Sequence, residues 1–266
     1  DACTRCELQE IQGIDSMRTR VKPDGTRYVR NFFGPGISHL DIRFGNSCNL
    51  KCVSCWEMSS SSIAEEAIAM KKAGIVPLHG VLEVPNFNWA SEETMKKFDE
   101  LPIREVYLTG GEPMMVRHLD KFLERLDPSV LVRFNTNGTI WNPKIEKLLR
   151  RFNMVIMSLS LDAASNKIDY IRSGSKWSEI EVNAQKYADF CKVDVTPTLS
   201  ILNALYYNEI KEYAQTNNFK LYDNLLILPE WLHVKNAPTV LKEQFKGIHP
   251  DVDQWANHPS DPKIIE

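Results

Sequence analysis

The sequence predicts an α/β fold built on a parallel sheet. Strand-type and helix-type hydrophobic patterns alternate along most of the chain, the alternation repeats through six strands, and no internal repeat interrupts it. Right-handed crossovers connect strands of this kind. Six such units form either a partial barrel or a doubly wound sheet, and the patterns alone do not separate the two.

The first elements follow a polar amino-terminal stretch. Gly34-Pro35-Gly36 breaks the chain before the first predicted strand, Ser38–Phe44. A helix pattern runs over Ser60–Lys72, and the serines at its start can supply an N-cap. After an irregular insert, Gly74–Ala90, a second helix begins at the capping residue Ser91.

The rest of the chain alternates more regularly. The further predicted strands are Glu105–Thr109, Val130–Asn135, Met154–Leu161, Val193–Ile201 and Leu221–Leu228. The helices between them are His118–Leu126, Pro143–Arg150, Lys167–Ile171, Ser178–Cys191 and Tyr206–Thr216. Beyond Pro229 the chain shows no clear period, so residues 229–266 are predicted to form a C-terminal tail.

Composition and charge exclude several classes of protein. The chain has 266 residues, 43% of them hydrophobic, which is enough to bury one large core. The formal net charge of −3 shows no basic excess, so no nucleic-acid partner is expected. No apolar run approaches the roughly 20 residues that cross a bilayer, so no membrane is expected. The start, Asp1–Cys6, lacks an initiator Met and a signal-peptide pattern, so we expect a fragment that has lost an upstream region.

The cysteines indicate metal binding. The chain has six of them, namely Cys3, Cys6, Cys48, Cys52, Cys55 and Cys191. Five fall in two tight groups, whereas a disulfide framework is typical of short secreted chains. We therefore expect metal ligands in a reducing cytoplasm, with Cys191 as a buried structural thiol at the end of a helix.

The group Cys48, Cys52 and Cys55 directly follows the first strand, with the spacing CxxxCxxC. In parallel α/β folds the loops after strands form the active face. Three thiolates can hold three irons of a cubane and leave the fourth iron open to a small molecule. The alternatives are a zinc site completed by another residue, or three unrelated cysteines.

Four more motifs follow successive strands. They are Thr109-Gly-Gly-Glu-Pro113, Asn135-Thr-Asn-Gly-Thr139, Ser158-Leu-Ser-Leu-Asp162, and Tyr170-Ile-Arg-Ser-Gly174. In the third motif, a period of two places Ser158, Ser160 and Asp162 on one face. Taken singly, each motif has an ordinary alternative: a Gly-Gly turn, an Asn-Gly turn or a surface arginine.

In this order, the cysteine loop and the four motifs resemble the radical SAM superfamily, from about Ser38 to Leu228. The resemblance implies a partial (β/α)6 TIM-like barrel over residues 36–228, with a [4Fe–4S] cluster on Cys48, Cys52 and Cys55. It also implies a pocket for S-adenosylmethionine (SAM) formed by Gly110, Gly111, Glu112, Asn137, Ser160, Asp162 and Arg172. One position departs from the pattern, because Ser54 stands where the family usually has an aromatic residue near the adenine, and Trp56 follows Cys55.

The same resemblance assigns roles within this pocket. The Gly-Gly backbone and Glu112 would bind the methionine ammonium, because glycines permit close approach and a carboxylate suits an ammonium. Ser160 and Asp162 would meet the ribose and carboxylate ends of the cofactor, and Arg172 would meet the carboxylate.

The amino-terminal pair Cys3 and Cys6, followed by Glu10 and Gly13, resembles the twitch/SPASM-like group, whose members have an auxiliary iron–sulfur cluster. We therefore predict that residues 1–35 form an accessory segment, a twitch-like remnant with an auxiliary site at Cys3 and Cys6. The alternatives are disordered terminal thiols and a small zinc site.

The resemblance implies an enzyme that reductively cleaves SAM to a 5′-deoxyadenosyl radical, which abstracts hydrogen from an unknown substrate. A peptide and a small polar metabolite are both candidate substrates, and the electron donor would be a flavodoxin or a ferredoxin. Whether SAM is a recycled cofactor or a consumed co-substrate stays open. The alternative is a non-catalytic scaffold that binds zinc or an iron–sulfur cluster.

Overall fold

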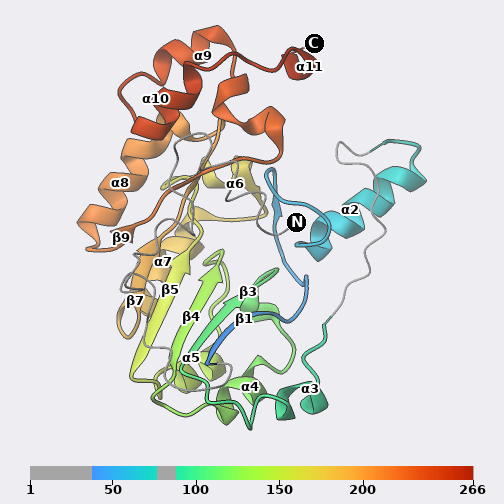
Figure 1. The fold of residues 1–266 in the computed structure, drawn as a ribbon, viewed down its shortest axis with the longest axis vertical. Helices are drawn as coiled ribbons and strands as arrows, with labels where there is room; N and C mark the ends of the chain where they lie inside the picture. The colour runs from blue at the N-terminus through green and yellow to red at the C-terminus, as the bar shows by residue number, and fades with distance from the viewer. Residues whose placement is uncertain (1–37, 77–87, 266) are drawn as a thin grey trace, which may run out of the picture. The chain divides into compact units, whose positions relative to one another are not determined.

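The computed structural model describes residues 38–76 and 88–265, and its centre is a six-stranded parallel sheet (Figure 1). The strands, in their order across the sheet, are β1 (His39–Arg43), β3 (Glu105–Thr109), β4 (Leu131–Thr136), β5 (Met154–Leu159), β7 (Lys192–Val195) and β9 (Lys220–Leu221). Each adjacent pair is parallel. The order across the sheet is therefore the order along the chain.

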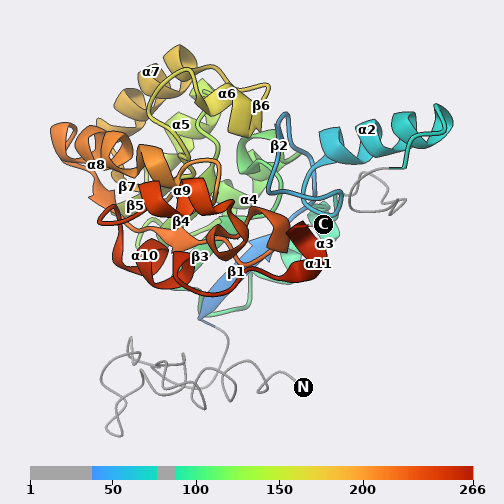
Figure 2. The same cartoon turned by 90° about the horizontal axis from the view of Figure 1, so that it is seen from above.

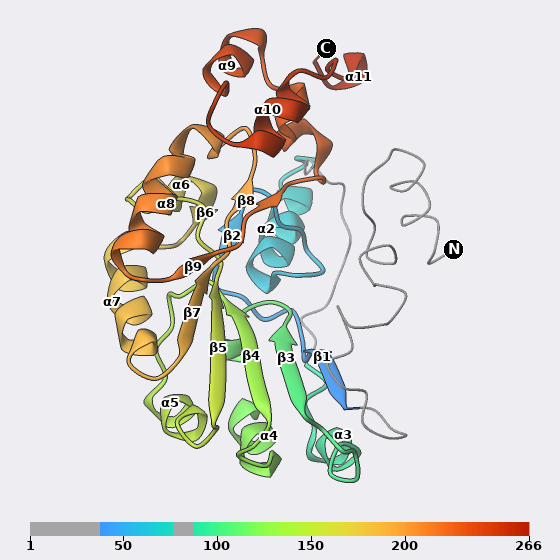
Figure 3. The same cartoon turned by 60° about the vertical axis from the view of Figure 1, so that its left-hand side comes forward.

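This strand order decides between the two predicted architectures. Because every crossover steps in the same direction and is right-handed, the connecting helices gather on one side of the sheet. A doubly wound sheet reverses direction and has helices on both sides. Figures 1 and 3 show the crossover helices outside a curved sheet. These helices are α4 (Leu119–Arg125), α5 (Pro143–Leu149), α7 (Trp177–Ala188) and α8 (Tyr207–Thr216). The predicted partial TIM-like barrel is thus confirmed.

The two faces of the sheet differ in polarity because strand side chains alternate. One face packs against the outer helices, and its buried members include Ile42, Val106, Leu108, Val132, Phe134, Met157 and Val195. The other face presents Asp41, Arg43, Tyr107, Thr109, Arg133 and Asn135 toward the barrel interior. A closed barrel fills its interior with branched apolar side chains. This polar interior instead leaves room for a ligand.

Two predicted strands, Val193–Ile201 and Leu221–Leu228, are each divided in the structure, and the second gives β9 and a separate short strand, β10 (Asn224–Leu225). After β7 the chain passes through Pro197 and forms a separate short strand, β8 (Thr198–Leu199), which pairs in parallel with β10. Proline has no N–H to donate to a sheet, so the ladder stops there. The Pro197 carbonyl still accepts from Asn224 N at 3.0 Å.

The region after Pro229 contains helices that the sequence pattern did not indicate. They are α9 (Thr239–Gln244), α10 (Pro250–Ala256) and α11 (Pro262–Ile265). Figures 1 and 3 place them beyond the carboxyl ends of the strands, and from above they overlie the sheet (Figure 2). Phe245 and Val252 pack with Leu199 and Tyr207 in a second apolar core. Helices of one or two turns are too short to show a readable period.

Two of the predictions lie outside the described residues: the accessory segment 1–35 and its pair Cys3 and Cys6. Most of the insert between α2 (Ser61–Lys72) and α3 (Glu92–Lys96) lies outside them as well. Within the described ranges, no helix has both the length and the apolar character needed to cross a membrane.

Candidate active site

A cavity of about 410 Å³ opens at the carboxyl ends of the strands. It brings together Cys48, Cys52, Cys55, Gly110, Gly111, Asn137, Ser160 and Arg172, all of which the sequence had singled out. The first three motifs after the cysteine loop follow β3, β4 and β5, so parallel pairing places them side by side. Glu112 and Asp162 do not line the cavity. Each is 1% exposed and lies just behind its wall.

The serines at the start of α2 hold the cysteine loop. Ser60 is the N-cap of α2, as predicted, and its hydroxyl also donates to Leu50 O at 2.7 Å. The next two hydroxyls fix the Cys48 backbone: Ser62 donates to Cys48 O at 2.7 Å, and Ser61 accepts from Cys48 N at 3.1 Å. The serine run therefore positions the first cysteine as well as starting the helix.

The two glycines after β3 are needed because two backbones meet. A Cβ on Gly111 would lie 2.2 Å from Ser47 O, and one on Gly110 would lie 2.8 Å from Gly45 O. Gly110 also has a φ of +118°, which side chains disfavour. Glu112 N donates to Ser47 O at 2.7 Å across the same contact. The Gly-Gly pair is therefore where this loop packs against the cysteine loop.

The Glu112 carboxylate links the loop after β3 to the loop after β4. It accepts hydrogen bonds from Met114 N at 3.0 Å, Thr136 Oγ1 at 2.8 Å and Asn137 N at 2.8 Å. Burial raises the pKa of Glu112, and these three hydrogen bonds oppose that rise. Two of the donors, Thr136 and Asn137, belong to residues that line the cavity, so the carboxylate is bound behind that wall. Contact between Glu112 and an ammonium stays a prediction.

An amide network joins the loop after β4 to the cysteine loop. Asn137 Nδ2 donates to Asn49 Oδ1 at 3.0 Å, and Asn49 Nδ2 donates to Thr139 Oγ1 at 2.9 Å. Thr139 in turn donates its N–H to Asn137 Oδ1 at 2.9 Å. The sequence offered no signal for Asn49, because it is one of the three residues between Cys48 and Cys52 that the CxxxCxxC spacing leaves unspecified.

Arg172 reaches the cavity from a short strand. β2 (Lys51–Cys52) pairs antiparallel with β6 (Arg172–Ser173), and Cys52 lies opposite Arg172. Arg172 Nε donates to Asp162 Oδ2 at 2.7 Å, and Nη1 lies 3.8 Å from Cys52 Sγ. Burial lowers the pKa of Arg172, but the neighbouring Asp162 and Cys52 raise it by more. The net pKa of Arg172 is therefore above the usual value for arginine. Asp162 therefore orients Arg172 from behind the cavity wall.

The three thiols fit a metal cluster. None is in a disulfide, and burial raises the pKa of each, to about 11 for Cys55. Buried thiols become thiolates when a cation binds them. In the part of the chain that the structure describes, no three His, Cys, Asp or Glu side chains gather closely enough to hold a single metal ion. A cubane places each cysteine on a different iron, so ligands spread around one cavity suit it.

Residues that the sequence left open or missed complete the wall. Tyr107 points into the cavity and donates to Asn135 Oδ1 at 2.8 Å. Asp41 and Arg43 line the cavity from β1 and had no sequence signal beyond their alternation in the strand. Trp56 also lines it, is 51% exposed, and donates from Nε1 to Ser59 Oγ at 3.0 Å. Trp56 is thus an aromatic side chain beside the cysteines, although the usual position is Ser54.

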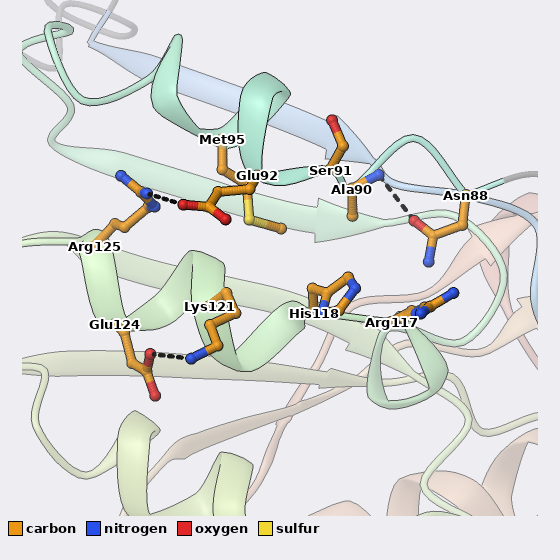
Figure 4. Close-up of a pocket in the computed structure, with 10 residues that line it drawn as sticks. All are labelled: Asn88, Ala90, Ser91, Glu92, Met95, Arg117, His118, Lys121, Glu124 and Arg125. Atoms are coloured by element: carbon orange, nitrogen blue, oxygen red, sulfur yellow. Dashed lines mark hydrogen bonds and ion pairs between the residues drawn. The ribbon is translucent and has the colours of Figure 1, made fainter.

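A larger cavity, of about 760 Å³, lies between α3 and α4 on the outer side of the sheet (Figure 4). Charged side chains are among its lining residues, with ion pairs between Arg125 and Glu92 and between Lys121 and Glu124. No residue of the cysteine loop or of the four motifs lines it. Although this cavity is larger, it lacks the cysteines and the motif residues. We therefore assign the candidate active site to the smaller cavity.

The chain belongs to the radical SAM superfamily, whose model matches residues 42–216, from β1 to the end of α8. Members of this superfamily are enzymes that use a [4Fe–4S] cluster together with SAM. The predicted family and its cofactors are thereby confirmed. The twitch-like detail falls on residues 1–35 and stays a prediction.

Individual relatives differ in activity. A "Probable GTP 3',8-cyclase" of Archaeoglobus fulgidus is 25% identical over 205 residues, covering 75% of this chain and 62% of that protein. The radical SAM cyclopropyl synthase TigE of Paramaledivibacter caminithermalis is 26% identical over 223 residues, covering 77% of this chain and 44% of that protein. The chain thus spans less than two thirds of the length of these relatives.

Solved structures agree on the fold. The enzyme anSMEcpe with bound AdoMet superposes with a TM-score of 0.58 at 16% identity, covering 78% of this chain and 58% of that chain. SuiB of Streptococcus suis, bound to its precursor peptide SuiA, gives 0.52 at 13% identity, covering 97% of this chain and 61% of that chain. At these identities the likeness concerns the fold alone.

Proposed function

We propose that this chain binds a [4Fe–4S] cluster through Cys48, Cys52 and Cys55 and uses it to cleave SAM. The observation that supports this best is the shared cavity: the three free cysteines of one loop line the same space as Gly111, Asn137 and other predicted cofactor residues. With both cofactors bound, the chemistry supplied is reductive cleavage of SAM to methionine and a 5′-deoxyadenosyl radical that removes hydrogen from a substrate.

The residues around the cavity divide into those that contact SAM and those that hold others in place. The half-buried backbone of Gly110 and Gly111, with Asn137 and Ser160, lines the cavity and forms the wall available to SAM. Glu112 and Asp162 act from behind this wall, because hydrogen bonds to neighbouring loops occupy their carboxylates. These residues would thereby orient SAM beside the three cysteines and limit access of water.

The substrate is proposed to be polar, either a peptide or a small polar metabolite. Support comes from the inner face of the sheet, where Asp41, Arg43 and Tyr107 line the cavity. A ligand pocket is usually apolar with few polar groups, so this polar wall suits a substrate that offers several hydrogen-bond partners.

The further proposals are a flavodoxin or ferredoxin as the electron donor, a cytoplasmic location and an auxiliary cluster at Cys3 and Cys6.

The test is anaerobic reconstitution of the whole chain with iron and sulfide, then dithionite and SAM, with 5′-deoxyadenosine quantified. Wild type is expected to take up iron and release 5′-deoxyadenosine. The Cys48→Ala, Cys52→Ala, Cys55→Ala triple variant is expected to do neither, because its cavity has no thiolate. A wild-type protein that binds zinc instead, or that cleaves no SAM with a full cluster, would favour the scaffold alternative.

A further inference from the structure

Arg172 faces a proposed cluster ligand. Its strand β6 pairs with β2 of the cysteine loop (Figure 3), so that its guanidinium lies beside Cys52. Nη1 donates to Cys52 Sγ at 3.8 Å, which is a hydrogen-bond distance for sulfur. The motif resemblance had assigned Arg172 to the carboxylate of SAM, and that assignment does not account for this contact.

The contact is held rigidly. Arg172 Nε is bound to Asp162 Oδ2 at 2.7 Å, and Asp162 Oδ1 accepts from Thr198 N at 2.8 Å. The exposed fractions of the Arg172 and Asp162 side chains are only 13% and 2%. A guanidinium stays protonated under all working conditions, and in a buried site its charge is weakly screened. Cys52 thus has a fixed positive charge as its neighbour.

We propose that Arg172 sets the reduction potential of the cluster through its hydrogen bond to the Cys52 sulfur, with Asp162 as its positioning residue. Hydrogen bonds to cluster sulfurs and nearby charges are what tune such potentials. One electron from a protein or chemical reductant makes the cluster more negative, and the guanidinium stabilises that reduced state. Arg172 therefore raises the midpoint potential and makes the cluster easier to reduce.

This inference rests on the proposed function, and its test separates the two. The full chain is reconstituted, its iron is counted, and the cluster is titrated electrochemically without SAM while the reduced state is followed by electron paramagnetic resonance. Because no SAM is present, a role confined to the SAM carboxylate leaves the midpoint unchanged. The variants are Arg172→Gln, which removes the charge, and Arg172→Lys, which keeps it but replaces the planar fork that bonds Asp162 and Cys52 with a single ammonium.

Arg43→Gln is the matched control. It removes the same charge from the same cavity, but within the part of the chain that the structure describes, the side chain that donates to a sulfur of the three cysteines is that of Arg172 and not that of Arg43. Arg172→Gln is expected to shift the equilibrium between oxidised and reduced cluster at least tenfold toward the oxidised form, which lowers the midpoint by about 59 mV. Arg43→Gln should move it less than half as far, and Arg172→Lys should fall between wild type and Arg172→Gln.

Three results, and a fourth that applies only where Arg172→Gln loses its iron, would overturn the inference. The first is Arg172→Gln with wild-type iron and an unchanged midpoint, and the second is Arg43→Gln with an equal shift, which would reflect general cavity charge. If Arg172→Gln loses its iron, Arg172→Lys decides: a lowered midpoint supports the inference, and a wild-type midpoint refutes it. The third is a wild-type chain that binds no iron. This result would refute the proposed function, on which the inference rests.

Discussion

At the scale of single residues, the most informative side chains are the ones that do not touch the cavity. Glu112 and Asp162 were predicted as cofactor ligands, yet each is buried and uses both carboxylate oxygens within the protein. Their residue types and positions were readable from sequence because the motifs recur at strand ends. Their contacts were not readable, because those depend on how three separate loops meet.

Glu112→Gln tests this positioning role. Its amide can keep one oxygen toward Met114 N and Thr136 Oγ1, but the NH₂ group then faces the Asn137 N–H, another donor. A buried donor without a partner costs about 1–3 kcal/mol, and we expect that loss in urea unfolding of the apoprotein. Glu93→Gln, whose side chain is 88% exposed, is the control and should stay within about 0.5 kcal/mol. Equal stability of the two variants would contradict the linking role.

At the scale of elements, the site is made by loops from neighbouring strands that touch at their backbones. The sequence predicted the first four strands with boundaries close to the observed ones, because period-two patterns and flanking turns are local signals. It did not distinguish a Gly-Gly turn from a Gly-Gly packing contact, since Gly45 and Ser47 lie about sixty residues earlier. It placed no break at Pro197, which divides one predicted strand between two sheets.

Gly111→Ala tests the backbone contact. The new Cβ would overlap Ser47 O, so the two loops must separate at a cost of about 1–3 kcal/mol. Because the second loop leads into Cys48, reconstituted iron should fall together with stability. Gly247→Ala is a useful comparison: its φ is +77° and its added Cβ meets nothing within 4 Å, so it should cost only about 1–2 kcal/mol of backbone strain and leave iron unchanged. Normal iron uptake by Gly111→Ala would refute the proposed contact.

At the scale of the whole molecule, strand order was the fact that the sequence could not supply. Local patterns indicate how many strand–helix units exist, but partial barrels and doubly wound sheets contain the same units. The region after Pro229 was missed for a related reason. Its helices are short, and their apolar residues serve a core shared with Leu199 and Tyr207, which belong to β8 and α8. Those distant partners give the segment its structure.

The last prediction follows from that shared core. Phe245 is fully buried in it, whereas Val240, five residues earlier on α9, is 72% exposed. Phe245→Ala should remove about 3–5 kcal/mol from the free energy of unfolding, measured by urea denaturation, because it leaves a cavity between the tail and the barrel. Val240→Ala should change it by no more than about 0.5 kcal/mol. Since β8 and α8 supply the other side of this core, the Phe245→Ala loss should appear in the single unfolding transition of the barrel. A separate early transition would instead show that residues 229–265 fold as an independent unit.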